Sequence, residues 1–191
     1  MTETQQILKE DYNSWYNIVK DIINDEEFQK RKYFKHHEKQ SVYEHSILVS
    51  AYSYKIAKKH HANIYNSTTA GLLHDFYTKA WQYSPELEKL DEKYRANFKG
   101  EKHHTKLLQM HGFTHAIDAS FNATTYYKDY INDRIISAIR THMFPLSLLT
   151  KYKLPKYKES WIITLSDKII TLKDFPTLKE IPKYLGIRRK K

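Results

Sequence analysis

A histidine and an aspartate stand side by side at the end of an apolar run, and this pair is the part of the chain best suited to chemistry. His74 and Asp75 follow the apolar residues 70–73, so both polar side chains should lie at the edge of a hydrophobic core. Burying an imidazole beside a carboxylate is costly unless both groups are satisfied, and a divalent metal ion satisfies both. A hydrogen-bonded pair that caps a helix is the alternative interpretation.

Three further residues with metal-binding side chains lie on the apolar sides of helical patterns, and these are His45, His142 and Asp167. The alternatives to metal binding are a satisfied core histidine at position 45 and a partner of a helix dipole at position 142. Together with His74 and Asp75, these side chains offer only nitrogen and oxygen atoms. Such ligands suit one or two divalent ions of Mn, Fe, Co, Ni or Zn.

A carboxylate such as that of Asp75 can bridge two metal ions, which then lie about 3.5–4 Å apart. Such a pair can hold the attacking and the leaving oxygen of a phosphoryl transfer, and each ion lowers the pKa of a water that it binds. Adjacent side chains diverge by about 100° around a helix, so His74 and Asp75 can face one ion only near a helix end or a bend.

The element that must position His45 is a helix expected over residues 41–60. Ser41 can cap its start, with Glu44 three residues later completing a capping box. The apolar stripe of this helix includes His45, which should therefore point toward the core.

The other metal-binding candidates also fall in segments with helical periodicity. Thr114 resembles the N-cap of a helix over 115–127, and Pro145 should stop a helix over 129–143. Further helices are expected over 4–24, 66–77, 103–111 and 158–173, with a short one opening at 25–27.

Composition indicates an all-α protein with a single domain. The 191 residues include only 4 Gly and 5 Pro, and the chain is long enough to bury a sizeable core. The absence of cysteine excludes disulfides and thiolate metal sites. No run approaches the about 20 apolar residues of a membrane span, and the first residues do not resemble a signal peptide. We therefore expect a cytoplasmic protein that does not bind membranes.

The net charge of +10 would attract phosphates, although solubility alone is the alternative explanation. The only dense basic run, residues 188–191, is terminal and is not interpreted as a nucleic-acid motif. The sequence has neither a helix-turn-helix pattern nor paired aromatic strands, so a nucleic-acid partner is not expected.

Taken together, these residues resemble the HD superfamily of metal-dependent phosphohydrolases over about residues 33–173. The superfamily pattern is a histidine, a His-Asp pair and a later aspartate, with two intervening histidines in members that hold two metals. The resemblance implies two ligand sets that share a bridging aspartate: His45, His74, Asp75 and Asp167 for the first metal, and Asp75, His115 and His142 for the second.

The resemblance also implies one HD-type helical bundle. We expect it to span 33–175, with an N-terminal helical extension over 1–32 that packs on the core and a basic tail over 176–191. Segments that are similar to a subgroup of small bacterial HD proteins stand at 41–46, 72–76, 111–115 and 142–146.

The chain departs from that subgroup at two places. Lys79, Ala80 and Gln82 surround Trp81 where the subgroup often carries an acidic residue and a histidine, so its substrate pocket cannot be carried over to this chain. Ala116 replaces a proline that often follows the histidine of the third segment.

Several residues near these motifs have competing interpretations. His111 competes with His115 as a ligand, and we favour His115. The tandem histidines are expected to be solvated, with His37 the one to watch because it is near the start of helix 41–60; these pairs stand at 36–37, 60–61 and 103–104. Tyr77 and Trp81 could stack on a base, although core packing is favoured.

Lys79 is a candidate catalytic contact to phosphate. It stands four residues after Asp75, one turn along if the helix continues, and could aim its ammonium group at a phosphate held by the metals. The superfamily often carries a lysine one position earlier, where Thr78 stands here.

The sequence thus favours a metal-dependent phosphohydrolase that cleaves a phosphate ester or anhydride with a metal-activated water. The resemblance implies a small phosphorylated substrate, of which a nucleotide or dinucleotide is the expected class. The alternative is a catalytically quiet HD module that binds metal and senses a nucleotide or a protein partner. The sequence leaves the oligomeric state open.

Overall fold

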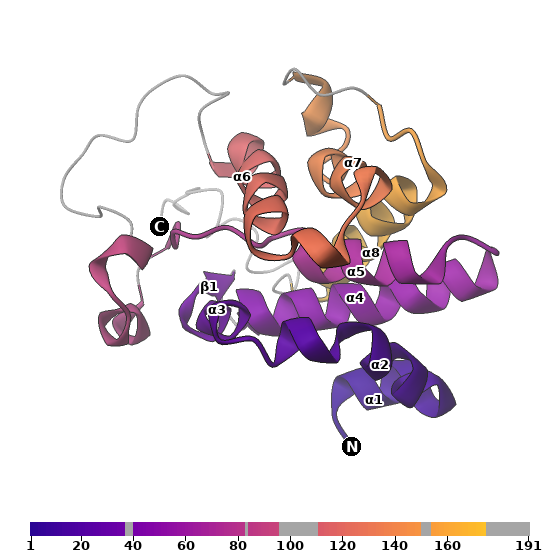
Figure 1. The fold of residues 1–191 in the computed structure, drawn as a ribbon, viewed down its shortest axis with the longest axis horizontal. Coiled ribbons are helices and arrows are strands. Elements are labelled where there is room, and N and C mark those ends of the chain that lie inside the picture. Colours follow the sequence, from indigo (N-terminus) through magenta and orange to yellow (C-terminus); the bar gives the residue numbers. More distant parts are fainter. Residues whose placement is uncertain (37–39, 83, 96–110, 150–153, 175–191) are drawn as a thin grey trace, which may run out of the picture.

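A computed structural model shows that the chain folds almost entirely into helices (Figure 1). It describes residues 1–36, 40–82, 84–95, 111–149 and 154–174. The α-helices are α1 (Glu3–Leu8), α2 (Tyr12–Ile23), α3 (Glu26–Gln29), α4 (Val42–Lys59), α5 (Ile64–Leu73), α6 (His111–Tyr126), α7 (Asp133–Thr141) and α8 (Lys158–Asp174). The expected all-α class is confirmed. No helix within the described ranges has the length and apolar character that crossing a bilayer requires.

Helices α4 and α5 lie side by side and form the centre on which the other helices pack (Figure 1). In this view α1 and α2 lie below the pair, and α6 and α7 lie above it. Helix α8 contacts α4, α5 and α7. The core between them includes Leu72 and Leu73 of α5, Ile135 and Ile139 of α7, and Ile163 of α8. These contacts hold α4, α5, α7 and α8 together around the polar cluster described below.

The start of α4 follows from local sequence. Ser41 Oγ accepts from the backbone N–H of Glu44, and the Glu44 carboxylate accepts from the backbone N–H of Ser41 at 2.8 Å. This capping box fixes Val42 as the first helical residue, as the sequence predicts. His45 therefore lies in the first turn of α4, and its ring is fully buried.

A short antiparallel hairpin precedes α4. Its strands are β1 (Lys35–His36) and β2 (Gln40–Ser41), and His36 pairs with Gln40. The 3-10 helix η2 (Lys30–Tyr33) leads into β1. Two further 3-10 helices, η3 (Pro85–Lys89) and η4 (Glu92–Tyr94), follow α5 in the chain.

The N-terminal helices share the main core. Trp15, Val19 and Ile22 of α2 are buried in it, and Trp15 Nε1 donates to Ser50 Oγ of α4 at 3.1 Å. The packing of an N-terminal segment on the bundle is thus visible. The domain boundaries expected at 32 and 175 stay predictions, and residues 176–191 lie outside the described part of the chain.

Several helix boundaries differ from the sequence expectations, among them the start of α7, which is Asp133 and not 129. The single helix expected over 4–24 is wrong, because Lys9 has a φ of 50° and separates α1 from α2. Thr114 is not an N-cap, because α6 already includes His111. Helix α5 ends at Leu73 instead of 77, where the chain turns and the N–H of Phe76 donates to the Leu73 carbonyl at 3.1 Å. The helix expected over 103–111 lies outside the described residues except for its last position.

Candidate metal centre

The six residues expected to bind metal converge from five helices or helix ends. His45 comes from α4, His115 from α6 and Asp167 from α8. His74 and Asp75 directly follow α5, and His142 is the C-cap residue of α7. The helix end at Leu73 matters, because it lets two adjacent side chains turn toward one point: His74 Nε2 lies 3.4 Å from Asp75 Oδ2.

The first group of side chains surrounds Asp75 Oδ2 and Asp167 Oδ1. His45 Nε2 lies 3.1 Å from Asp167 Oδ1 and 3.9 Å from Asp75 Oδ2. His74 Nε2 lies 3.6 Å from the same Asp167 oxygen. All four residues are buried except Asp167, whose side chain is 14% exposed. These are the four residues that the resemblance implies for the first metal, and the structure brings them together.

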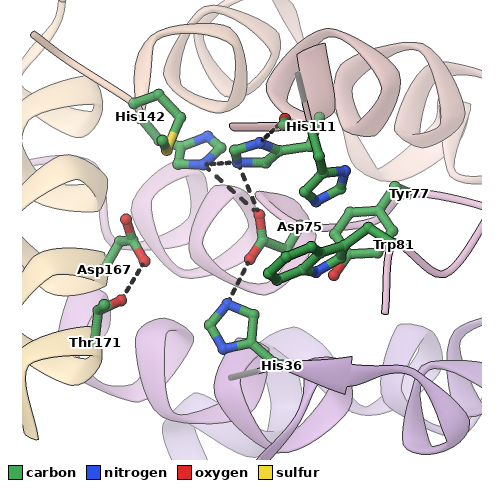
Figure 2. Close-up of a pocket in the computed structure, with 10 residues that line it drawn as sticks. His36, Asp75, Tyr77, Trp81, His111, His142, Asp167 and Thr171 are labelled. Atoms are coloured by element: carbon green, nitrogen blue, oxygen red, sulfur yellow. Dashed lines mark hydrogen bonds and ion pairs between the residues drawn. The ribbon is translucent and has the colours of Figure 1, made fainter. Parts of the chain in front are cut away.

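The second group faces the other oxygen of the same carboxylate. His115 Nε2 lies 3.4 Å from Asp75 Oδ1, and His142 Nε2 lies 3.7 Å from it (Figure 2). Asp75 therefore presents one oxygen to each group, which is the arrangement of a carboxylate that bridges two ions.

The hydrogen bonds of three rings determine which nitrogen faces the centre. Each Nδ1 lies 2.7–2.9 Å from a backbone carbonyl oxygen, which can only accept, so each Nδ1 must carry the proton. The pairs are His74 with Gly71, His115 with His111, and His142 with Ile139. In the neutral rings the Nε2 lone pairs therefore point into the centre, as metal ligands require.

Burial and the two carboxylates set the protonation of the cluster. Burial lowers the pKa of His45 to about 4 and that of His142 to about 3, with help from neighbouring histidines. Burial also opposes the charged form of His74, but the carboxylates of Asp75 and Asp167 outweigh it and raise its pKa to about 9. The pKa of each carboxyl lies well below its usual range, because the histidines outweigh its desolvation.

Among the described residues, two buried polar atoms of the cluster lack hydrogen-bond partners, which indicates whether a cation would fit there. His74 Nε2 and Asp75 Oδ1 are buried and have no hydrogen-bond partner within the described residues. Donor atoms of His45, His74 and Asp167 lie within 4.8 Å of one another, and so do those of His74, Asp75 and His142. Buried polar atoms without a hydrogen-bond partner are costly unless another group, such as a cation, satisfies them. The donor set thus fits divalent transition metals.

A cavity of about 420 Å³ opens beside the second group (Figure 2). Its walls are formed mainly by aromatic rings and by side chains of the two groups. The lining residues are His36, Asp75, Tyr77, Trp81, His111, His115, His142, Met143, Asp167 and Thr171. Trp81 is partly buried and stacks on His111, with ring centroids 5.0 Å apart, whereas Tyr77 is packed in the core.

The structure places the remaining candidates as follows. His115, not His111, faces Asp75, and the ring of His111 lies against Trp81. Lys79 is exposed and does not line the cavity. The helix that would have carried it one turn beyond Asp75 ends at Leu73, so the geometry assumed for its phosphate contact is wrong.

His36 is the residue that sequence reasoning missed. It was expected to be solvated, but it is only 7% exposed, and its Nε2 lies 3.4 Å from Asp75 Oδ2. The available signal was a pair of histidines directly before the helix that carries His45. His37, the second of that pair, lies outside the described residues.

Fold and site together define a helical protein with a buried histidine-aspartate cluster that could hold a metal. Comparison with protein families agrees, because the model of the HD domain matches residues 42–172. The chain therefore belongs to the HD domain family, the superfamily of metal-dependent phosphohydrolases. A search of curated proteins and a search of solved structures each gave no match.

Proposed function

We propose that this protein is a metal-dependent hydrolase of a phosphate ester or anhydride. The observation that carries the proposal is the position of Asp75, whose two carboxylate oxygens each face a separate group of histidines. His45, His74, Asp75 and Asp167 would hold one ion, and Asp75, His115 and His142 the other. Two ions that share a carboxylate can bind both the attacking and the leaving oxygen of a phosphoryl transfer.

Bound divalent ions would supply a water of lowered pKa and withdraw charge from the phosphoryl group. The chain contributes fixed geometry, because the Nδ1 hydrogen bonds hold the rings of His74, His115 and His142. Burial strengthens the electrostatic interaction of the site with a phosphate, since little water screens it.

The substrate that we propose is a small phosphorylated molecule, with a nucleotide as the first candidate. The cavity of about 420 Å³ is in the size range of small-molecule sites. Its wall includes the partly buried ring of Trp81 beside the metal centre, and an indole face can stack on a nucleobase. The net charge of +10 would favour the approach of an anionic substrate. Cytoplasmic location is part of the same proposal.

The test is hydrolysis of a panel of nucleotides and dinucleotides and of an aryl phosphate, with added Mn²⁺ or Fe²⁺ and with the metal content measured. We expect metal-dependent turnover of at least one substrate. Failure of every substrate with protein shown to carry two ions would overturn the proposal.

The nucleotide part has its own test in Trp81→Ala. Loss of stacking should raise KM for a nucleotide about tenfold, which corresponds to about 1.4 kcal/mol, and leave an aryl phosphate less affected. Trp161→Ala is the matched control, because Trp161 is 48% exposed on α8 and does not line this cavity. An equal effect of the two substitutions on nucleotide KM would exclude base stacking by Trp81.

One observation favours the second candidate function, a metal-binding module that senses a nucleotide without cleaving it. No Lys or Arg lines the cavity within the described residues, so the chain there offers no fixed cation to the phosphate besides the metal centre. Calorimetric binding of a nucleotide to protein that shows no turnover would support this alternative.

A further inference from the structure

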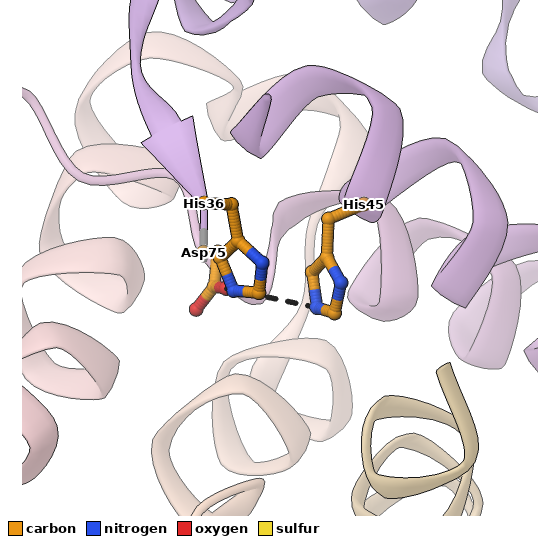
Figure 3. A group of neighbouring side chains, drawn as sticks. All are labelled: His36, His45 and Asp75. Carbon is orange, nitrogen blue, oxygen red and sulfur yellow. Dashed lines mark ion pairs between the residues drawn. The ribbon is translucent and has the colours of Figure 1, made fainter. Parts of the chain in front are cut away.

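His36 reaches the metal centre from outside the helical bundle. It stands in β1, where it pairs with Gln40 of β2, and the hairpin places its ring against the ring of His45 (Figure 3). The two ring centroids lie 3.8 Å apart, with 21° between the ring planes. His36 Nε2 lies 3.4 Å from Asp75 Oδ2, the same oxygen that faces His45 and His74.

We propose that His36 is a fifth protein ligand of the first metal, in addition to His45, His74, Asp75 and Asp167. This inference rests on the two-metal site of the proposed function. It adds a residue that lies before the segment matched by the HD model, which begins at residue 42.

Distances support direct ligation. Donor atoms that each lie about 2.1 Å from one ion can be at most about 4.2 Å apart. Asp75 Oδ2 lies 3.4 Å from His36 Nε2 and 3.9 Å from His45 Nε2, both inside this limit. Donor atoms of these three residues all lie within 4.8 Å of one another, and all three residues are buried. Because the rings of His36 and His45 are stacked, they must turn apart for the three donor atoms to meet at one ion.

This assignment gives the two metal ions different numbers of protein ligands. A six-coordinate ion with five protein ligands keeps one free position, whereas an ion held by Asp75, His115 and His142 keeps three. The cavity is lined by both residues that belong to the second set alone, His115 and His142, and by His36, Asp75 and Asp167 of the first set, so it is open to both ions. The second ion then has more positions for substrate and water, and the first ion keeps a single position for one of the two oxygens.

A positioning role is the competing explanation. In that role His36 would donate a hydrogen bond to Asp75 Oδ2 and would never contact the ion. Loss of such an outer partner also weakens metal binding, by about 10–100-fold in other sites, so affinity alone cannot separate the two roles. The visible spectrum of bound Co²⁺ can, because it responds to the number and type of the ligand atoms.

The experiment titrates the apoprotein with Co²⁺ and records both binding and the visible spectrum. Wild-type protein should bind two ions. His36→Ala should lower the affinity of the tighter ion at least tenfold and alter its Co²⁺ bands, and added imidazole should restore them. His36→Gln keeps a hydrogen-bond donor but loses the ring nitrogen, so its spectrum should also change. Circular dichroism checks that each variant is folded.

His111→Ala is the matched control, since His111 lines the same cavity and faces Trp81. Its backbone carbonyl, which accepts from His115, remains in the variant. We expect wild-type Co²⁺ bands for it. Unchanged Co²⁺ bands in both His36 variants would overturn the fifth-ligand assignment, and so would wild-type affinity and wild-type bands in His36→Gln alone. Either result would leave the proposed function standing. A wild-type protein that binds no Co²⁺, Mn²⁺ or Fe²⁺ would instead overturn the proposed function itself.

Discussion

His115 Nε2 lies 3.0 Å from His142 Nε2, although both rings donate from Nδ1 to a backbone carbonyl. Two neutral imidazoles in this tautomer direct lone pairs at each other, which is repulsive unless a proton or a cation lies between or beside them. Burial lowers the pKa of His142 to about 3, which disfavours a proton there at neutral pH. The arrangement is therefore the one that a metal-loaded centre stabilises.

Metal removal should consequently destabilise the protein. A ligand at a hundredfold excess over its Kd stabilises the folded state by about 2.7 kcal/mol. For a chain of this size, each kcal/mol shifts Tm by about 2–4 °C, so stripping with a chelator should lower Tm by about 5–11 °C. Thermal unfolding before and after chelation, and after return of Mn²⁺, measures this shift. His142→Ala should show a smaller shift, and equal Tm values with and without metal would contradict the expectation.

Asp75 should be the residue whose loss removes both ions. Its two oxygens face separate groups of histidines, so Asp75→Ala would delete one ligand from each of the two proposed ions and remove the negative charge between them. We expect elemental analysis to find neither metal in the purified variant, while circular dichroism shows the helices intact. Asp21→Asn is the control, because Asp21 is exposed on α2 and should leave metal content unchanged. Retention of two ions by Asp75→Ala would refute the bridging role.

Those parts of the site that depend on local signals could be predicted from the sequence. The capping box of Ser41 and Glu44 fixes the start of α4 within one turn, and this places His45 on the buried side. The sequence predicts that His74 and Asp75 face one ion only if a helix ends near them. The structure has such an end, because α5 stops at Leu73.

Other parts depend on contacts that leave no local pattern. Strand β1 has two residues, too few for any periodicity, so nothing in the sequence shows that His36 is buried. The position assumed for Lys79 failed because α5 ends at Leu73, although buried residues continue through Phe76 and Tyr77. Periodicity reports which residues are buried, and it does not report where the backbone leaves the helix.

Gly71 permits the close approach of α5 to α4, and its replacement should disturb the metal centre. A Cβ at this position would lie 2.8 Å from Ser53 Oγ and 3.1 Å from Ser50 Cα. Overpacking of this kind costs about 1–3 kcal/mol, and the better helix propensity of alanine offsets up to about 1 kcal/mol. We expect Gly71→Ala to lose about 1–2 kcal/mol in urea unfolding. Metal affinity should fall as well, because the Gly71 carbonyl orients His74.

Ser53→Ala provides the matched test of that explanation. The buried Ser53 hydroxyl has no hydrogen-bond partner within the described residues, so its removal alone should cost little. In the double variant with Gly71→Ala, the closest contact of the new methyl group disappears, and part of the lost stability should return. Strict additivity of the two substitutions would show that crowding at Ser53 is not the cause.

A buried ion pair beneath the site should give the protein a specific acid sensitivity. The two terminal guanidinium nitrogens of the fully buried Arg31 each lie 3.1 Å from Glu27 Oε1, and Lys30 and Tyr94 donate to Oε2 at 2.8 and 2.7 Å. The Arg31 guanidinium lies over the ring of Phe76, the residue after Asp75. The network therefore ties the segment before β1 to the segment that carries the metal centre.

Burial alone would raise the pKa of Glu27. The hydrogen bonds from Lys30 and Tyr94 and the charge of Arg31 outweigh burial, so the pKa of Glu27 lies below the usual 4.5. Because the pKa of Glu27 is lower in the folded protein, its ionised carboxylate stabilises the fold fully well above pH 4.5. This stabilisation is lost as the pH falls through the pKa of Glu27 in the folded protein.

Glu27→Gln should cost about 3 kcal/mol at pH 7, because it leaves Arg31 without its counter-ion. Urea unfolding of the apoprotein between pH 3 and pH 7 should show this difference shrinking below about pH 4.5. Glu26→Gln, an exposed neighbour, should track wild type throughout. A wild-type advantage that stays constant down to pH 3 would show that the Glu27 carboxylate does not provide the stabilisation.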